Sequence, residues 1–112
     1  MSFQPNNNTK YTSDNKEIIN ILGKAKKENI MKYILSLPKE RLDCSDEMFA
    51  RRLGITDRTI RKWRDSKNTT IPSIEYLVAI CDELLFDKEI YYLLLNKFYP
   101  ETYEKILKIE NR

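Results

Sequence analysis

The chain has 112 residues, of which 41% are hydrophobic and 33% are charged, and this balance favours one folded, helix-rich domain over a disordered chain. No apolar stretch approaches the roughly 20 residues needed to cross a bilayer, and the first ten residues lack the layout of a signal peptide, so we expect a cytoplasmic protein. The absence of histidine, of paired cysteines and of a glycine-rich phosphate loop argues against an enzyme, a metal site or any other cofactor.

The formal net charge is +3, but the charge is distributed unevenly. Residues 1–38 carry six basic against three acidic residues, and residues 39–73 carry nine against six, so each segment has a net charge of +3. Residues 74–112 carry five basic against eight acidic residues, a net charge of −3. A nucleic-acid surface is therefore expected in the first two thirds of the chain, with the C-terminal third turned away from phosphate.

Residues 1–13 are polar, rich in asparagine and without helical periodicity, which predicts a flexible tail. The alternative is an arm that enters a minor groove, although Lys10 is its only cation. Residues 14–112 are expected to form a single helical domain. A helical pattern begins at Asp14 and is interrupted by Gly23 and the lysines that follow it.

A second helix is predicted from about Lys27 to Leu37, because apolar residues recur there at helical spacing. Pro38 is expected to stop it, since the residue before a proline avoids the helical region. Four lysines form a basic cluster on the polar side of this region. The cluster consists of Lys24, Lys26, Lys27 and Lys32. Its simplest interpretation is a solvated face, and the alternative is contact with phosphate.

Two short helices joined by a tight turn are predicted within residues 45–67. Ser45 can accept a hydrogen bond from a free backbone N–H at the start of the first helix. Gly54 stands where the end of a helix favours a left-handed residue. Thr56 can cap the second helix, and Asp57 suits the positive end of its dipole. Caps and turn together predict a helix-turn-helix, with three residues of the first helix facing inward: Phe49, Ala50 and Leu53.

Three further helices are predicted after the polar loop that precedes Pro72. Ser73 can cap the first, from Ile74 to about Leu85, whose apolar positions are Leu77, Val78, Ile80, Cys81 and Leu84. Asp87 opens the next, and the last spans about residues 101–109. Residues 87–110 either close the core or form a dimer interface, and both roles suit their apolar and aromatic side chains: Tyr91, Tyr92, Leu95, Phe98, Tyr99 and Tyr103.

Helical geometry places Ile60 and Trp63 on the buried side of the second helix of the pair, which leaves Arg58, Arg61 and Lys62 on its outer side. An α-helix fits the major groove of DNA, where Arg and Lys donate to guanine O6 and N7. These three residues are therefore predicted base readers.

Asp57 has two interpretations, as an acceptor from a cytosine amino group or as part of the helix cap. Trp63 and Tyr33 resemble base-stacking residues, but both fall on apolar stripes and are assigned to the core. Phosphate contacts are expected at helix starts and in the following loop, at Ser45, Thr56, Lys67 and Asn68.

Residues 48–63, M-F-A-R-R-L-G-I-T-D-R-T-I-R-K-W, resemble the lambda-repressor/Cro-like (Xre-like) helix-turn-helix family. The stretch from Pro72, P-S-I-E-Y-L-V-A-I-C, is similar to the next helix of that family, so the resemblance covers about residues 28–86. The chain departs from the family at Arg64 and Ser66, where Glu and Gly are frequent. The resemblance implies DNA binding, usually by homodimers on palindromic operators, with base-reading positions at Asp57, Arg58, Arg61 and Lys62 and phosphate-contacting positions near Ser45, Thr56, Lys67 and Asn68.

The sequence thus predicts an all-α protein, a compact bundle of five to seven helices with a helix-turn-helix and no β wing. The predicted function is sequence-specific binding of double-stranded DNA by a repressor-like transcriptional regulator of a bacterium, phage or mobile element. The expected partners are a palindromic operator and a second copy of the chain. Two alternatives use the same fold, a protein-interaction module such as an antitoxin or inhibitor, and an architectural DNA binder.

Overall fold

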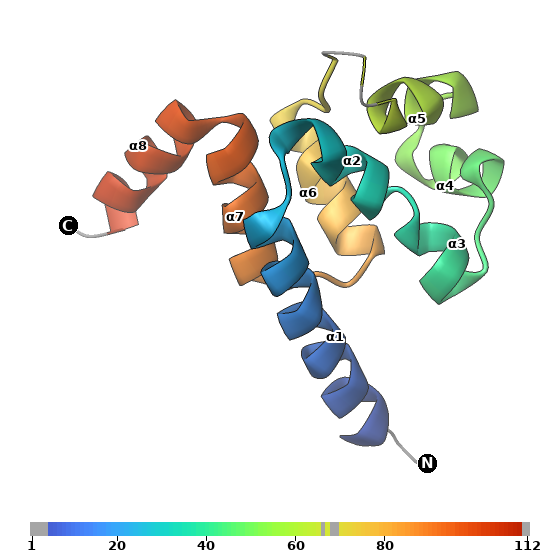
Figure 1. Cartoon of the computed structure of the whole chain (residues 1–112), viewed down its shortest axis with the longest axis horizontal. Coiled ribbons are helices and arrows are strands. Elements are labelled where there is room, and N and C mark those ends of the chain that lie inside the picture. The colour runs from blue at the N-terminus through green and yellow to red at the C-terminus, as the bar shows by residue number, and fades with distance from the viewer. Residues whose placement is uncertain (1–4, 66, 68–69, 111–112) are drawn as a thin grey trace.

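The part of the chain that the structure describes folds into eight helices and contains no strand. The computed structural model describes residues 5–65, 67 and 70–110, with side chains from Asn15 onward. The predicted all-α fold without a β wing is confirmed within these ranges. The helices are α1 (Pro5–Lys24), α2 (Lys27–Ile34), α3 (Leu37–Leu42), α4 (Asp46–Leu53), α5 (Asp57–Arg64), α6 (Ile74–Glu83), α7 (Lys88–Phe98) and α8 (Pro100–Glu110) (Figure 1).

Helix α1 is longer at both ends than its periodicity predicts. It begins at Pro5, so residues 5–13, expected as a flexible tail, are helical, while residues 1–4 lie outside the described range. Proline suits the first position of a helix, because its φ is already helical and its missing N–H would have no partner there. Gly23 does not interrupt the helix. A glycine costs about 1 kcal/mol at such a position, which burial of Ile18 and Leu22 offsets.

The helix predicted from Lys27 to Leu37 is divided into α2 and α3. Helix α2 ends at Ile34, where the Ser36 hydroxyl donates to the Tyr33 carbonyl at 2.6 Å. The prediction that Pro38 stops the preceding helix is wrong. Pro38 lies instead in the first turn of α3. A proline is as compatible with the first turn of a new helix as with the end of an old one, and the sequence pattern does not separate the two cases.

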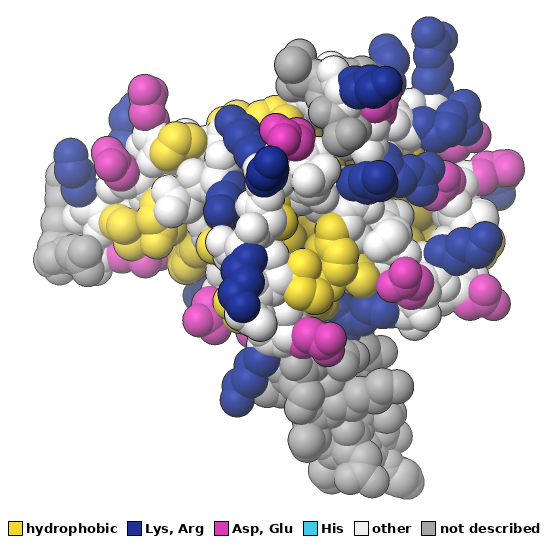
Figure 2. Space-filling model, in the orientation of Figure 1, with side chains coloured by type: hydrophobic (Ala, Val, Ile, Leu, Met, Phe, Trp, Pro, Cys, Tyr) yellow, Lys and Arg dark blue, Asp and Glu magenta, His cyan; other side chains and the backbone are white. Residues whose placement is uncertain are grey.

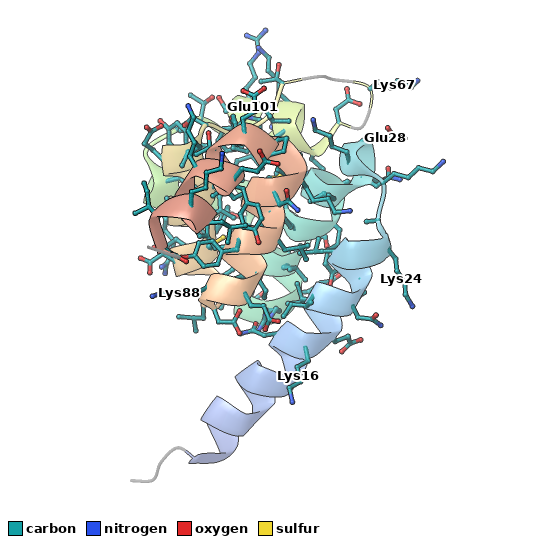
Figure 3. All side chains as sticks on the ribbon, turned by 90° about the vertical axis from the view of Figure 1, so that its left-hand side faces the viewer. Lys16, Lys24, Glu28, Lys67, Lys88 and Glu101 are labelled. Carbon is teal, nitrogen blue, oxygen red and sulfur yellow. The ribbon has the colours of Figure 1, made fainter. Side chains whose placement is uncertain are left out.

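The core lies between α1, α2, α4, α5, α6 and α7, and α8 packs against α7 from outside it. Figure 1 shows α5 and α8 on opposite sides of the molecule, with α1 extending away from both. In Figure 3 the N-terminal end of α1 and Lys67 lie at opposite ends. The largest fully buried side chains come from six helices: Leu22, Ile30, Ile34, Phe49, Ile60, Leu77, Ile80, Ile90, Leu94 and Leu95. Val78, predicted as an apolar inward position, is instead 48% exposed.

The aromatic C-terminal residues mostly complete the chain's own core. Leu95 and Phe98 are buried, and the Tyr99 hydroxyl donates to the Pro72 carbonyl at 2.7 Å. Tyr92 packs on the ring of Tyr103, with centroids 6.2 Å apart. Helix α8 has no buried residue, so it covers α7 from one side only.

Leu85 adopts a left-handed backbone conformation, with φ of +60°, at the C-terminal end of α6. A non-glycine residue there costs about 1–2 kcal/mol, and the exposed side chain contributes little packing in return. Leu85→Gly is therefore expected to raise the free energy of unfolding by up to about 1 kcal/mol in urea denaturation. Gly54→Ala, at φ of +73°, is the matched opposite and should lower it. If both changes destabilise, backbone strain is not the controlling effect.

Candidate nucleic-acid interface

Helices α4 and α5 are capped as the sequence predicts, and residues 54–56 connect them. The Ser45 hydroxyl accepts the Met48 N–H at 3.2 Å, and the Thr56 hydroxyl accepts the Thr59 N–H at 3.3 Å. Gly54 ends α4 in the left-handed region, which a residue with a side chain rarely adopts. These local bonds hold two eight-residue helices, too short to persist alone, in a defined connection. The pair is named the α4–α5 unit below.

One side of α5 is anchored in the core. Ile60 is 1% exposed and Trp63 is 6% exposed. The Trp63 ring packs on Tyr76 with a centroid distance of 5.5 Å, and half-buried Tyr33 also contacts the core. The assignment of Trp63 and Tyr33 to the core is thus confirmed. Because α5 is fixed along this side, its opposite side has a defined outward direction.

An ion pair joins the end of α5 to the start of α4. The Arg64 guanidinium donates two hydrogen bonds to the Asp46 carboxylate, one of them 3.1 Å between Nη1 and Oδ1. Both side chains are about two-thirds buried. Bidentate arginine–carboxylate pairs fix orientation as well as distance, so the pair holds the far ends of the unit together. Sequence reasoning missed this contact, because 18 residues separate the partners and no local spacing signals it.

The predicted base readers divide into two classes. Arg58 and Lys62 are exposed, and neither forms an ion pair with any residue in the described ranges. Asp57 and Arg61 instead form an ion pair with each other, 2.9 Å between Oδ2 and Nη1, one helical turn apart. The spacing of four residues was a signal for this pair that the sequence reasoning did not use. Arg58 and Lys62 can therefore meet a ligand directly, whereas Arg61 must first release Asp57.

Ion pairing also accounts for the other arginines of the unit. Arg51 binds Glu47 at 3.0 Å, and Arg52 binds Glu83 of α6 at 2.9 Å. Within the described part of the chain, Arg58 is thus the arginine of α4 and α5 that has no carboxylate partner. Its uncompensated charge is the one that an external phosphate or base edge would meet.

The predicted phosphate-contacting residues lie around α5. Ser45 and Thr56 are exposed, with one acceptor position of each hydroxyl used by its cap. Lys67 is exposed, and its backbone N–H donates to Asp65 Oδ1 at 3.0 Å. Asn68 lies outside the described residues. The basic residues of α5, from Arg58 to Arg64, are flanked by Asp57 at the start of the helix and Asp65 at its end.

The described residues offer little other chemistry. No group of three or more His, Cys, Asp or Glu among them is placed to hold a metal ion. Burial is the larger cause and the nearby Asp82 carboxylate the smaller one of a raised pKa of the Cys81 thiol, about 12. The thiol is therefore protonated and a poor nucleophile at neutral pH. Among the described residues, no helix combines the length and the apolar character that crossing a membrane requires.

The basic surface of the α4–α5 unit is visible in Figure 2, where Lys and Arg side chains cover its outer side. Apolar side chains are visible over α8, at the opposite side of the molecule, and in a second patch near the centre of this face. A functional assignment therefore depends on these residues and their geometry. No protein-family model, no curated protein and no solved structure matches the chain.

Proposed function

We propose that the chain binds double-stranded DNA with α5 in the major groove and acts as a repressor-like transcriptional regulator of a bacterium, phage or mobile element. The observation that carries the proposal is the outer side of α5, where Arg58 and Lys62 are exposed and form no ion pair with a described residue, on a helix that the core holds in place. The major groove admits an α-helix, and each base pair presents a distinct donor and acceptor pattern there.

The geometry supports a division of roles. Arg58 lies in the first turn of α5 and Lys62 one turn later, both positioned to donate to guanine O6 and N7. Arg61 contributes after it exchanges Asp57 for a base or phosphate. Phosphates flanking the groove would be held by exposed donors around the helix, at Ser45, Thr56 and Lys67. No cofactor takes part in this recognition.

A homodimer is part of the proposal, since a single module buries too little surface for strong specificity. Two copies would read half-sites about 34 Å apart, one turn of duplex, on a palindromic operator in the cytoplasm. We assign pairing to α8, because it buries none of its residues and leaves Leu107 and Ile109 exposed on different sides of the helix.

Selection of bound sequences from a random DNA pool tests the proposal. Enrichment of a palindrome would support a dimeric, sequence-specific regulator. Weak sequence preference with steep salt dependence would instead support an architectural DNA binder. Absence of any enrichment at moderate salt would contradict DNA recognition and favour a protein-interaction module built on the same fold.

Asp57 provides a further prediction, because its carboxylate neutralises Arg61 and is itself partly exposed to solvent beside that residue. Asp57→Asn is expected to tighten binding to unrelated duplexes several-fold, since it releases one cation and removes one repulsion from phosphate. Fluorescence anisotropy in a salt series measures this change. Asp65→Asn is the matched control, removing the same charge without releasing Arg61. Discrimination between selected and unrelated duplexes would fall only if Asp57 also reads cytosine.

A further inference from the structure

A second group of unpaired cations lies where α1 meets α2. Lys24 ends α1, Lys26 precedes α2 and Lys27 begins it, and all three are exposed. None of them forms an ion pair with a residue in the described ranges, although Glu28 follows directly in sequence. This contrasts with the arginines of α4 and α5, most of which have a carboxylate partner. The three lysines are named the α1–α2 corner below.

The backbone holds the α1–α2 corner in a fixed place. Leu22 and Ile30, on either side of it, are fully buried, and Ala25 at the bend packs against the core. The Asn29 N–H donates to the Lys26 carbonyl at 2.9 Å, which closes the first turn of α2. The backbone positions from which the lysine side chains extend are therefore set by the core. Cations held in this way lose less order on binding than cations on a free tail.

The α2 side of the α1–α2 corner lies near Lys67, in the loop that follows α5, whereas Lys24 lies farther away, toward the body of α1 (Figure 3). Helix α2 packs against α5, which places its start close to this loop in Figure 1. In the perpendicular view of Figure 3, Glu28 of α2 and Lys67 of the loop again lie together at one end. Figure 2 shows basic side chains over α1 and α2 at the centre of the molecule and over α4 and α5 beside them. A duplex lying along α5 and past Lys67 would therefore pass near the start of α2, where Lys26 and Lys27 lie, and Lys24 would contact phosphates farther along the flank.

We propose that the α1–α2 corner is a second phosphate-contacting surface, which binds the DNA backbone beside the segment read by α5. This inference rests on the proposed function and extends it. It assigns phosphate binding to lysines that would have no binding role if they formed only a solvated face. Lysine binds phosphate as a point charge and carries no sequence information, so the corner adds affinity for any duplex.

The test compares Lys24→Ala/Lys26→Ala/Lys27→Ala with the matched triple variant Lys16→Ala/Lys88→Ala/Lys97→Ala, which removes the same charge from positions on α1 and α7 outside the corner. Binding to the selected duplex and to an unrelated duplex is measured by anisotropy in a salt series. The corner variant should bind both duplexes about tenfold or more weakly than wild type near 0.1 M salt. The slope of log K against log salt should fall by about 0.9 for each phosphate that the variant no longer neutralises.

A shortened duplex, without the flank beside the α5 site, makes the test specific. Wild-type protein should lose affinity on this duplex, whereas the corner variant should bind long and short duplexes equally. Replacing the three lysines with arginine should preserve binding. Equal weakening in the corner and control variants, or an unchanged salt slope, would overturn the proposal while leaving DNA recognition by α5 intact. If wild-type protein binds no duplex, the proposed function fails, and the corner proposal fails with it.

Discussion

Replacing Arg58 and Lys62 together with alanine is expected to weaken binding to the selected duplex by about 2–6 kcal/mol, roughly 30-fold to more than 10,000-fold. Each bidentate contact from Arg or Lys to guanine contributes about 1–3 kcal/mol of discrimination, and α5 presents two such donors that form no ion pair with any residue that the structure describes. The loss should be larger for the selected duplex than for an unrelated one. Competition anisotropy with both duplexes measures the ratio.

The control for this prediction is Lys16→Ala/Lys88→Ala, which makes the same change in charge on α1 and α7, far from Lys67 in Figure 3. It should reduce affinity for both duplexes slightly and equally, through the long-range field alone. Retained operator preference after removal of Arg58 and Lys62 would exclude the base-reading mechanism for α5. Equal weakening by the two double variants would show that only total charge matters.

Trp63→Ala is expected to lower the free energy of unfolding by about 3–5 kcal/mol. The side chain is 6% exposed and packs on Tyr76, so its removal leaves a cavity at the centre of the surface that positions α5. A domain of this size has a total stability of about 5–15 kcal/mol, so the variant should lose a large share of its stability. Urea denaturation followed by far-UV circular dichroism measures the change, because Trp63 is the only tryptophan and its fluorescence is lost.

Two other variants provide comparisons for the loss of unfolding free energy expected from Trp63→Ala. Trp63→Phe keeps an aromatic ring and should cost clearly less than Trp63→Ala. Met48→Ala changes an exposed apolar residue of α4 and should stay within about 0.5 kcal/mol of wild type. A cost below about 1 kcal/mol for Trp63→Ala would contradict its structural role and return Trp63 to the candidates for base stacking.

Sequence reasoning succeeded where a single residue has a specific local role. Ser45, Gly54 and Thr56 each meet a requirement of the backbone at a helix end, and all three have the predicted conformation. Ser73 shows the limit of such reasoning, since it precedes α6 as predicted but its side chain makes no capping hydrogen bond. A suitable residue at a helix start fixes the position of the helix more reliably than it fixes the hydrogen bond.

The contacts that reasoning from sequence did not find depend on the arrangement of helices. The partner of Arg64 is on another helix, and the choice of Asp46 follows from the packing of α4 on α5. The division of α2 from α3 was missed because Pro38 is compatible with two opposite positions in a helix. That α5 reads DNA stays a prediction from its residue types, burial and ion pairs.

The acidic residues at the two ends of α5 limit the information that the helix can extract from DNA. The basic span from Arg58 to Lys62, bounded by Asp57 and Asp65, covers about 6 Å of helix axis, and base pairs follow one another every 3.4 Å or so. One subunit would therefore read only a recognition sequence of about three base pairs. Such a sequence occurs by chance on the order of once per hundred base pairs, far too often to specify one site among millions. Recognition of a single site in a genome would thus require two such sequences at a fixed separation.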